Sequence, residues 1–119
     1  MDVVNLQDKF SLIQEHWQPK IAGEVNDAYI KLAKLKGEFL WHKHDAEDEL
    51  FLVIKGNLTI KLRDRDLHLA EGEFAIIPKG VEHMPVAAEE VHVMLIEPKA
   101  TLNTGDRQTD RTLPELERI

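Results

Sequence analysis

Apolar and polar residues alternate along short segments in the middle of the chain. Every second residue is apolar from Leu58 to Leu62, and two leucines flank His68. A repeat of two residues is typical of strands that bury one face. The segment 50–54 is apolar throughout, which is expected where both faces of a strand are covered. The pattern therefore predicts several short strands in this part of the chain.

Turn-forming residues separate the apolar segments at short intervals. The clearest turn signals are Asn26-Asp27, Lys55-Gly56-Asn57, Arg63 to Asp66, Glu71-Gly72 and Pro78-Lys79-Gly80. Many short strands with regularly spaced turns favour an all-β sandwich or barrel. The stretch 12–35 is expected to hold two or three strands, interrupted by Pro19 and by the first of these turns. Helix is expected only at 6–10, where Asn5 can cap the first turn.

The length of 119 residues fits one domain. We expect residues 1–119 to form a single domain whose core barrel covers about 12–97. The C-terminal tail (98–119) lacks apolar periodicity, and its few apolar residues are expected to dock on the barrel or on a neighbouring subunit.

The composition narrows the chemistry that the chain can support. It contains no cysteine, which excludes disulfides, thiolate metal sites and a cysteine nucleophile. Any bound metal must therefore have nitrogen and oxygen ligands. The formal net charge of −7 repels phosphate backbones, so nucleic-acid binding is disfavoured.

The N-terminal residues lack a positively charged start followed by an apolar run, so no signal peptide is expected. No apolar stretch approaches the roughly 20 residues that a membrane span needs. We therefore expect a cytoplasmic protein that does not bind a membrane.

Two histidines and a glutamate stand at spacings that suit a metal site. His42 and His44 are two residues apart, so on a strand both imidazoles point to the same face. Glu49 follows a short polar loop and begins the next apolar segment, so a hairpin would place it opposite the two histidines. Imidazoles and carboxylates are ligands that divalent transition metals prefer.

A second segment adds a third histidine. Residues 72–85 are predicted to form a strand, a tight turn and a second strand, with His83 three residues beyond the turn glycine, Gly80. His83 would supply an imidazole from a neighbouring strand. The alternative is an exposed His-x-His pair without a ligand, which accounts for the first segment but leaves the second as a coincidence.

The two segments together resemble the two sequence motifs of the cupin superfamily. The spacings are His-x-His-x4-Glu-x6-Gly and Gly-x5-Pro-x-Gly-x2-His. The metal-ligand positions of the motifs are matched by His42, His44, Glu49 and His83. The remaining motif positions are matched by Gly56, Gly72, Pro78 and Gly80. Two positions differ, because Gly37 lies one residue nearer to the first histidine and Ala87 replaces the closing asparagine.

The resemblance implies a double-stranded β-helix, the jelly-roll barrel of small single-domain cupins of the mannose-6-phosphate isomerase-like type. It also implies one divalent metal ion on the four matched ligands, for which Fe, Mn, Ni, Zn and Cu are all suitable. A cupin whose site stays empty is the alternative. The resemblance also implies a homodimer, because single-domain cupins are more often dimers than monomers. The apolar segments Leu12 to Ile21 and Leu40 to Trp41 could supply the interface.

An octahedral ion on these ligands would keep two positions open for an oxygen-containing ligand. We therefore expect a metal-dependent enzyme, an isomerase or an oxygenase, that acts on a small oxygenated or sugar-like substrate. The alternative is a non-catalytic, metal-dependent module that binds a small molecule or a sugar. A cupin domain of a transcription regulator is disfavoured, because no helix-turn-helix pattern fits the sequence.

Spacing alone does not select a catalytic acid or base. Tyr29, Glu38 and His92 are candidates. His16 and His68 match no motif position and are expected to have no role in the site.

Residue parity gives expectations for the surroundings of the metal. Phe51 and Val53 share parity with Glu49, so they are candidates for the pocket lining or for ordinary core, and Phe39 is a third candidate. Trp41 and Lys43 alternate with the histidine ligands and should point away from the metal.

Overall fold

Seven antiparallel strands and one short helix make up the fold in the computed structural model, which describes residues 1–119. In chain order the elements are α1 (Leu6–Phe10), β1 (Lys20–Val25), β2 (Ala28–Glu38), β3 (Glu49–Lys55), β4 (Leu58–Leu62), β5 (Asp66–Leu69), β6 (Phe74–Ile77) and β7 (His83–Pro98). The all-β prediction with one short N-terminal helix is confirmed. Asn5 caps α1, because its side-chain oxygen accepts a hydrogen bond from the Asp8 N–H at 2.9 Å. No helix of the structure is long and apolar enough to cross a membrane.

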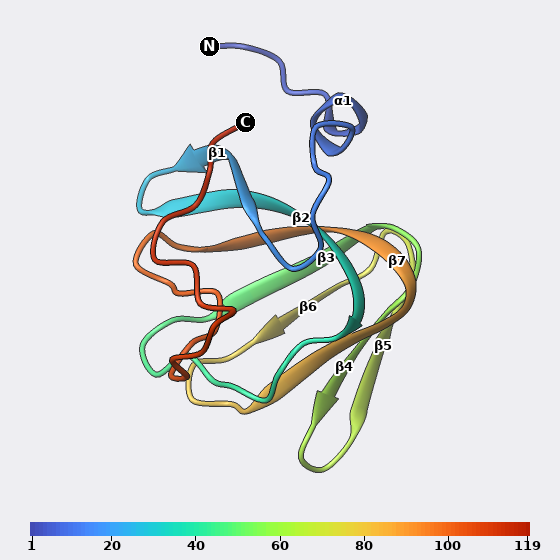
Figure 1. Ribbon diagram of the computed structural model, residues 1–119, viewed down its shortest axis with the longest axis vertical. Helices are drawn as coiled ribbons and strands as arrows, with labels where there is room; N and C mark the ends of the chain where they lie inside the picture. The colour runs from blue at the N-terminus through green and yellow to red at the C-terminus, as the bar shows by residue number, and fades with distance from the viewer.

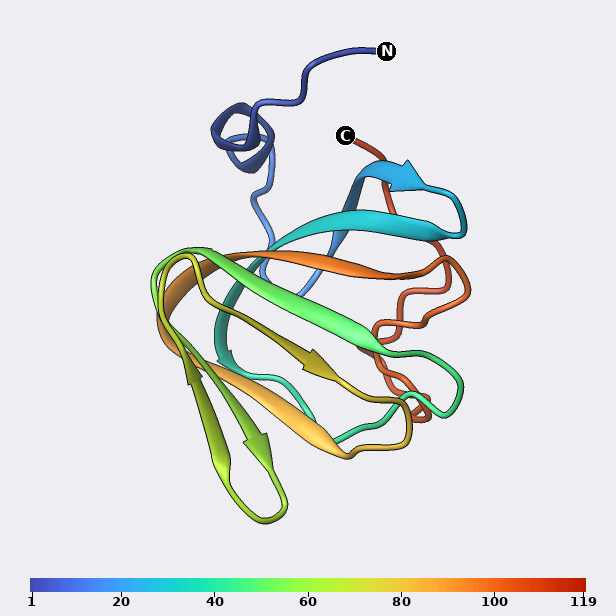
Figure 2. The same ribbon diagram turned by 180° about the vertical axis from the view of Figure 1, so that it is seen from behind.

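Strand β7 joins the two halves of the barrel (Figures 1 and 2). Its first residues, 83–86, pair with β4, whereas its later residues, 92–96, pair with β3. Strand β2 pairs with both parts of β7 from the other side. Because β7 curves between the two halves, residues near its beginning and its end, Pro85 and Glu97, line the same cavity.

The interior of the barrel is filled by residues that alternate along the strands. In β7 the buried apolar positions are Val91, Val93 and Leu95, and in β3 they are Phe51 and Val53. This is the predicted period of two, and each fully buried aliphatic side chain contributes roughly 1.5–3 kcal/mol to stability. The interior is therefore apolar, so any polar side chain within it needs a specific partner.

The outer face of β3 is less covered than the apolar run at 50–54 predicts, because its outward residues are only half-buried. A second small core covers one end of this face, where Phe10 of α1 and Ile13 pack on Leu32 of β2. Further along, on the edge strand β6, Phe74 and Ile76 keep more than half of their surface exposed. The protection of this sheet face therefore ends before its edge strand.

The apolar segments expected at a subunit interface mostly make contacts within the chain. Ile13 is in the second core, Trp17 stacks on Phe39 with ring centroids 4.9 Å apart, and the Arg63 guanidinium lies 3.8 Å over the Trp41 ring. The homodimer stays a prediction.

The C-terminal tail (98–119) docks on the barrel of its own chain, which is one of the two predicted arrangements (Figure 1). At its end, the Ile21 N–H donates to the Glu117 carbonyl at 2.8 Å and the Ile119 N–H donates to the Ile21 carbonyl at 3.0 Å. Nearer to β7, the Asp106 N–H donates to the Lys43 carbonyl at 2.9 Å, and the Lys43 N–H donates to the Asp106 carboxylate at 3.0 Å. The tail is thus fastened to the residue between His42 and His44.

Gly105 allows this close approach. Its φ is +59°, and a Cβ at this position would collide with the Lys43 carbonyl oxygen and lie 3.0 Å from the His42 ring. Only a residue without a side chain fits both the backbone conformation and the space.

We predict that Gly105→Ala detaches the middle of the tail, since the added methyl group collides with backbone that cannot give way. Limited proteolysis should cleave within 106–119 faster than in the wild type, and stability should fall by roughly 1–3 kcal/mol. Gly72→Ala is the matched control, because Gly72 also has a positive φ (+79°) but no atom lies within 4 Å of its added Cβ. Equal proteolysis of the two variants would contradict the proposed fit of Gly105.

Candidate metal centre

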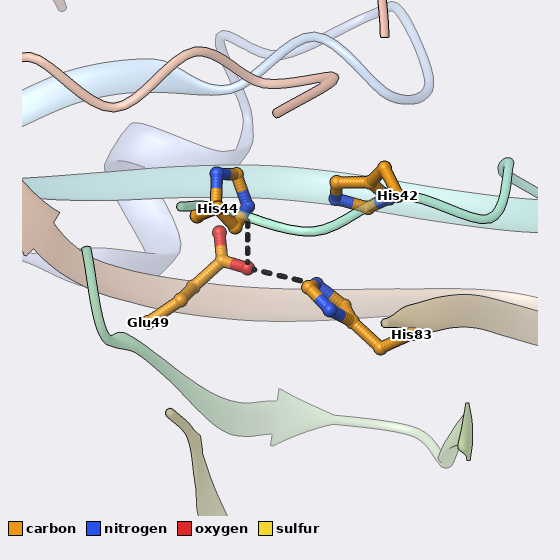
Figure 3. A group of neighbouring side chains, drawn as sticks. All are labelled: His42, His44, Glu49 and His83. Carbon is orange, nitrogen blue, oxygen red and sulfur yellow. Dashed lines mark hydrogen bonds and ion pairs between the residues drawn. The ribbon is translucent and has the colours of Figure 1, made fainter. Parts of the chain in front are cut away.

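The four side chains that the sequence predicts as ligands lie together (Figure 3). This four-residue cluster consists of His42, His44, Glu49 and His83, all of them buried. One potential ligand atom from each residue lies within 4.8 Å of the others. The cluster could therefore hold one metal ion without a large rearrangement.

His42 and His44 are held in the site by a different backbone arrangement from the one predicted. His42 and His44 lie on the irregular connection between β2 and β3 and not on a regular strand. No hairpin forms between this connection and β3, because β7 lies between β2 and β3 in the sheet. Instead the connection pairs with the start of β7, where the His42 N–H donates to the His83 carbonyl at 3.1 Å and the His83 N–H donates to the His42 carbonyl at 2.9 Å.

Backbone carbonyls fix the orientation of two imidazole rings. The ring nitrogens Nδ1 of His42 and His83 each lie 2.9 Å from the carbonyl oxygen two residues earlier, which belongs to Leu40 and to Val81 respectively. A carbonyl oxygen only accepts, so Nδ1 carries the hydrogen in both rings. In the neutral ring Nε2 is then a free lone pair, which is the form that binds a metal.

Glu49 is the first residue of β3 and lies between two of the histidines (Figure 3). Its Oε1 atom is 3.3 Å from Nε2 of His44 and 3.3 Å from Nε2 of His83. His44 is only 3% exposed. Neither of its ring nitrogens makes a hydrogen bond, because the contact with Glu49 does not have hydrogen-bond geometry. A buried polar atom without a partner costs about 1–3 kcal/mol. A cation within the cluster would give His44 the partner that the protein does not supply.

The electrostatics favour the metal-binding protonation states. Burial, together with the neighbouring His83, lowers the pKa of His42 to about 4, so its imidazole is neutral at pH 7. Burial alone would raise the pKa of the Glu49 carboxyl, but the neighbouring Glu97, His44 and His83 side chains outweigh it and hold that pKa well below its usual range. A neutral imidazole and an ionised carboxylate are the forms that coordinate metals.

A cavity of about 40 Å³ adjoins the cluster on the side of His42 and Glu49. Phe51 forms part of its apolar wall, as its parity with Glu49 predicts, and Phe39 also lines it. Val53 belongs to the core and does not line the cavity. The tail contributes Asn103 to the lining.

Sequence reasoning missed a further carboxyl group at the cavity, Glu97. Its Oε1 accepts a hydrogen bond from Lys31 Nζ at 2.7 Å, and both side chains are almost fully buried. Burial and the nearby charge of Glu49 raise the pKa of Glu97 well above its usual range. The signal was present in the sequence, because Glu97 continues the inward row of Val91, Val93 and Leu95.

The three residues considered as acid or base do not line this cavity. Tyr29 accepts a hydrogen bond from Arg118 at 3.3 Å, beside the tail, Glu38 is exposed, and His92 stacks on Phe10 outside the barrel.

The remaining side chains behave as the sequence predicts. His68 is exposed on β5, and His16 pairs with Glu90 on the surface at 2.8 Å. Trp41 and Lys43 do not line the cavity.

Comparison with known proteins places this geometry in a context. The family model for the cupin domain matches residues 29–98. A cupin-2 domain containing protein from Shewanella frigidimarina is 50% identical, with 82% of this chain and 95% of that chain covered and a TM-score of 0.81. Protein NMB1881 from Neisseria meningitidis is 30% identical, with 82% of this chain and 100% of that chain covered and a TM-score of 0.75.

Among curated proteins, YdbB of Bacillus subtilis is 43% identical over 61 residues, which are 50% of this chain and 54% of that protein. The chain thus spans about half the length of this curated relative. The structural matches confirm the predicted jelly-roll barrel.

We predict that the metal-free protein loses stability as the pH falls from 6.5 to about 4. The upper limit is the ordinary pKa of a histidine, which applies to the unfolded chain, and the lower limit is the pKa of His42 in the fold. Between these values the unfolded chain binds more protons than the folded one, so stability rises with pH. The shift corresponds to roughly 3 kcal/mol. Urea unfolding across this range should show a shallower pH dependence for His42→Gln than for the wild type. Equal slopes would contradict the assignment of a neutral, buried His42.

Proposed function

This chain belongs to the cupin domain family, and we propose that it is a metal-dependent enzyme that acts on a small oxygenated or sugar-like substrate. The observation that carries the proposal is the buried four-residue cluster, whose ligand atoms lie within 4.8 Å of one another. Ionisable groups gathered inside an apolar barrel are costly unless they are paired or bind a cation. The unpartnered nitrogens of His44 support a cation as the missing partner.

The four-residue cluster would hold one divalent ion through three imidazole nitrogens and one carboxylate oxygen. Fe, Mn, Ni, Zn and Cu all accept such donors. When bound, the ion supplies a Lewis acid and a template for an oxygen-containing ligand. Three neutral imidazoles and one carboxylate leave a net charge near +1 at the centre, which favours anionic or strongly polar oxygen ligands.

The contribution of the protein itself is orientation and exclusion of water. The carbonyls of Leu40 and Val81 hold two imidazole rings in place. The apolar walls, which include Phe51 and Leu95, limit the cavity to about 40 Å³, which is room for about three water molecules. A substrate larger than this would enter with its reactive end alone.

Both reaction classes expected from the sequence, isomerisation and oxygenation, can use an oxygen-containing ligand held beside a metal. The second carboxyl group at the cavity wall favours an enzyme over a passive binding module, because it adds a polar group within reach of a bound ligand.

We predict that His44→Ala lowers the metal content more than tenfold, since it removes one of the four ligands and leaves a gap in the cluster. The check is elemental analysis of protein purified without chelators and of protein reloaded with Zn, Mn, Fe, Ni or Cu. His68→Ala is the matched control, because His68 is exposed on β5 and is not part of the cluster. Undiminished metal stoichiometry in His44→Ala would overturn the site.

We predict that the metal-loaded wild type turns over at least one substrate in a screen of sugars, hydroxy acids and oxygenation substrates, and that His44→Ala does not. The same compounds should be tested for thermal stabilisation of the protein. Stabilisation without turnover would replace the enzyme by the non-catalytic binding module. Turnover that survives in His44→Ala would separate the activity from the cluster.

A further inference from the structure

Glu97 is a buried carboxyl group at the cavity wall that is not part of the four-residue cluster. It is 3% exposed and lines the cavity together with His42 and Glu49. Its Oε1 accepts the hydrogen bond from Lys31, but no donor of the protein reaches Oε2. The neighbouring Glu49 carboxylate can only accept a hydrogen bond, so it is a partner for Glu97 only while Glu97 carries a proton. A hydroxyl group beside Glu97 in the cavity would give this carboxyl group a hydrogen-bond partner in either protonation state.

Stability alone does not account for the Lys31–Glu97 pair. Lys31 lies on the inward side of β2 with Ala33 and Leu35, and Glu97 continues the inward apolar row of β7. Apolar residues at both positions would extend the core without the cost of removing two charges from water, and such replacements are often neutral or stabilising. The distinctive property of the pair is its location, because it brings a polar group to the cavity beside the cluster.

We propose that Glu97, held in place by Lys31, binds a hydroxyl group of a ligand. A second oxygen, on the neighbouring carbon atom of the same ligand, would bind at the metal centre. This inference rests on the metal site of the proposed function. A hydroxyl group both donates and accepts, so it suits the Glu97 carboxyl whether or not that group carries a proton. The matching ligand class carries a hydroxyl group and a second oxygen on neighbouring carbon atoms, as in a 2-hydroxy acid, a 1,2-diol or the hydroxyketone end of an open-chain sugar.

The test compares glycolate with acetate on the cobalt(II)-loaded protein, with binding followed through the visible absorption of the metal. Acetate has the carboxylate but lacks the hydroxyl group. The wild type should prefer glycolate by about tenfold or more, as expected for a hydrogen bond to a charged or strongly polar group. The double variant Lys31→Met/Glu97→Leu should keep the affinity for acetate and lose this preference. Both partners are replaced together so that no buried charge is left unpaired.

Glu97→Gln should keep most of the preference, since its amide still hydrogen-bonds a hydroxyl group. Glu90→Gln is the matched control, because it makes the same change on the same strand at an exposed position outside the cavity. An undiminished preference for glycolate in the double variant would overturn the role of Glu97. A wild type that binds no cobalt would overturn the metal site and, with it, this inference.

A crystal structure of the cobalt-loaded wild type with glycolate gives a second reading that does not depend on how any variant folds. The glycolate hydroxyl group should lie within hydrogen-bond distance of Glu97 Oε2. A bound glycolate whose hydroxyl group points away from Glu97 would overturn the inference and leave the metal site intact.

Discussion

The pair of backbone hydrogen bonds between His42 and His83 is the contact on which the candidate site depends. It fastens an irregular connection to the first residue of β7, and it brings the two imidazole centroids to 4.4 Å. Each ring is then oriented by the carbonyl two residues before it, so the same local arrangement occurs on both sides of the pair. When these rings are neutral, backbone geometry alone leaves the lone pair on Nε2 of each, without any side chain outside the cluster.

The second constraint is the cost of charge within an apolar barrel. Glu49 is stabilised as a carboxylate by its neighbours, and Lys31 compensates Glu97 at 2.7 Å, but His44 has no hydrogen-bond partner. The protein alone therefore leaves part of the buried polar cluster unsatisfied. An ion that binds only the folded chain adds stability in proportion to the logarithm of its concentration over Kd. Metal binding at the cluster would therefore be coupled to folding.

The four residues of the cluster could be predicted from the sequence because their spacing repeats a known pattern and because strand parity places side chains on faces. Parity with Glu49 also predicted that Phe51 would line the cavity. The hairpin prediction was wrong because local periodicity does not state which strand pairs with which, and the pairing of 42 with 83 spans 41 residues of chain. Glu97 was within reach of the parity argument, yet a charged residue before a proline resembles the end of a strand. The fit of Gly105 against Lys43 has no local signature, since it depends on a contact between segments distant in sequence.

The tail and the barrel together set the size of the cavity. Asn103 of the tail lines the cavity, and the guanidinium of Arg111 lies 4.7 Å over the Phe39 ring and donates to the Phe39 carbonyl at 3.0 Å. Phe39 in turn stacks on Trp17, so three segments meet at the same wall. Each of these contacts is weak by itself, because exposed cation–π contacts contribute roughly 0.5–1 kcal/mol. The wall of the cavity is therefore held by several small contacts from the tail and the barrel together. The chemistry of the site is fixed by the barrel, and the size of what reaches it is governed by the tail.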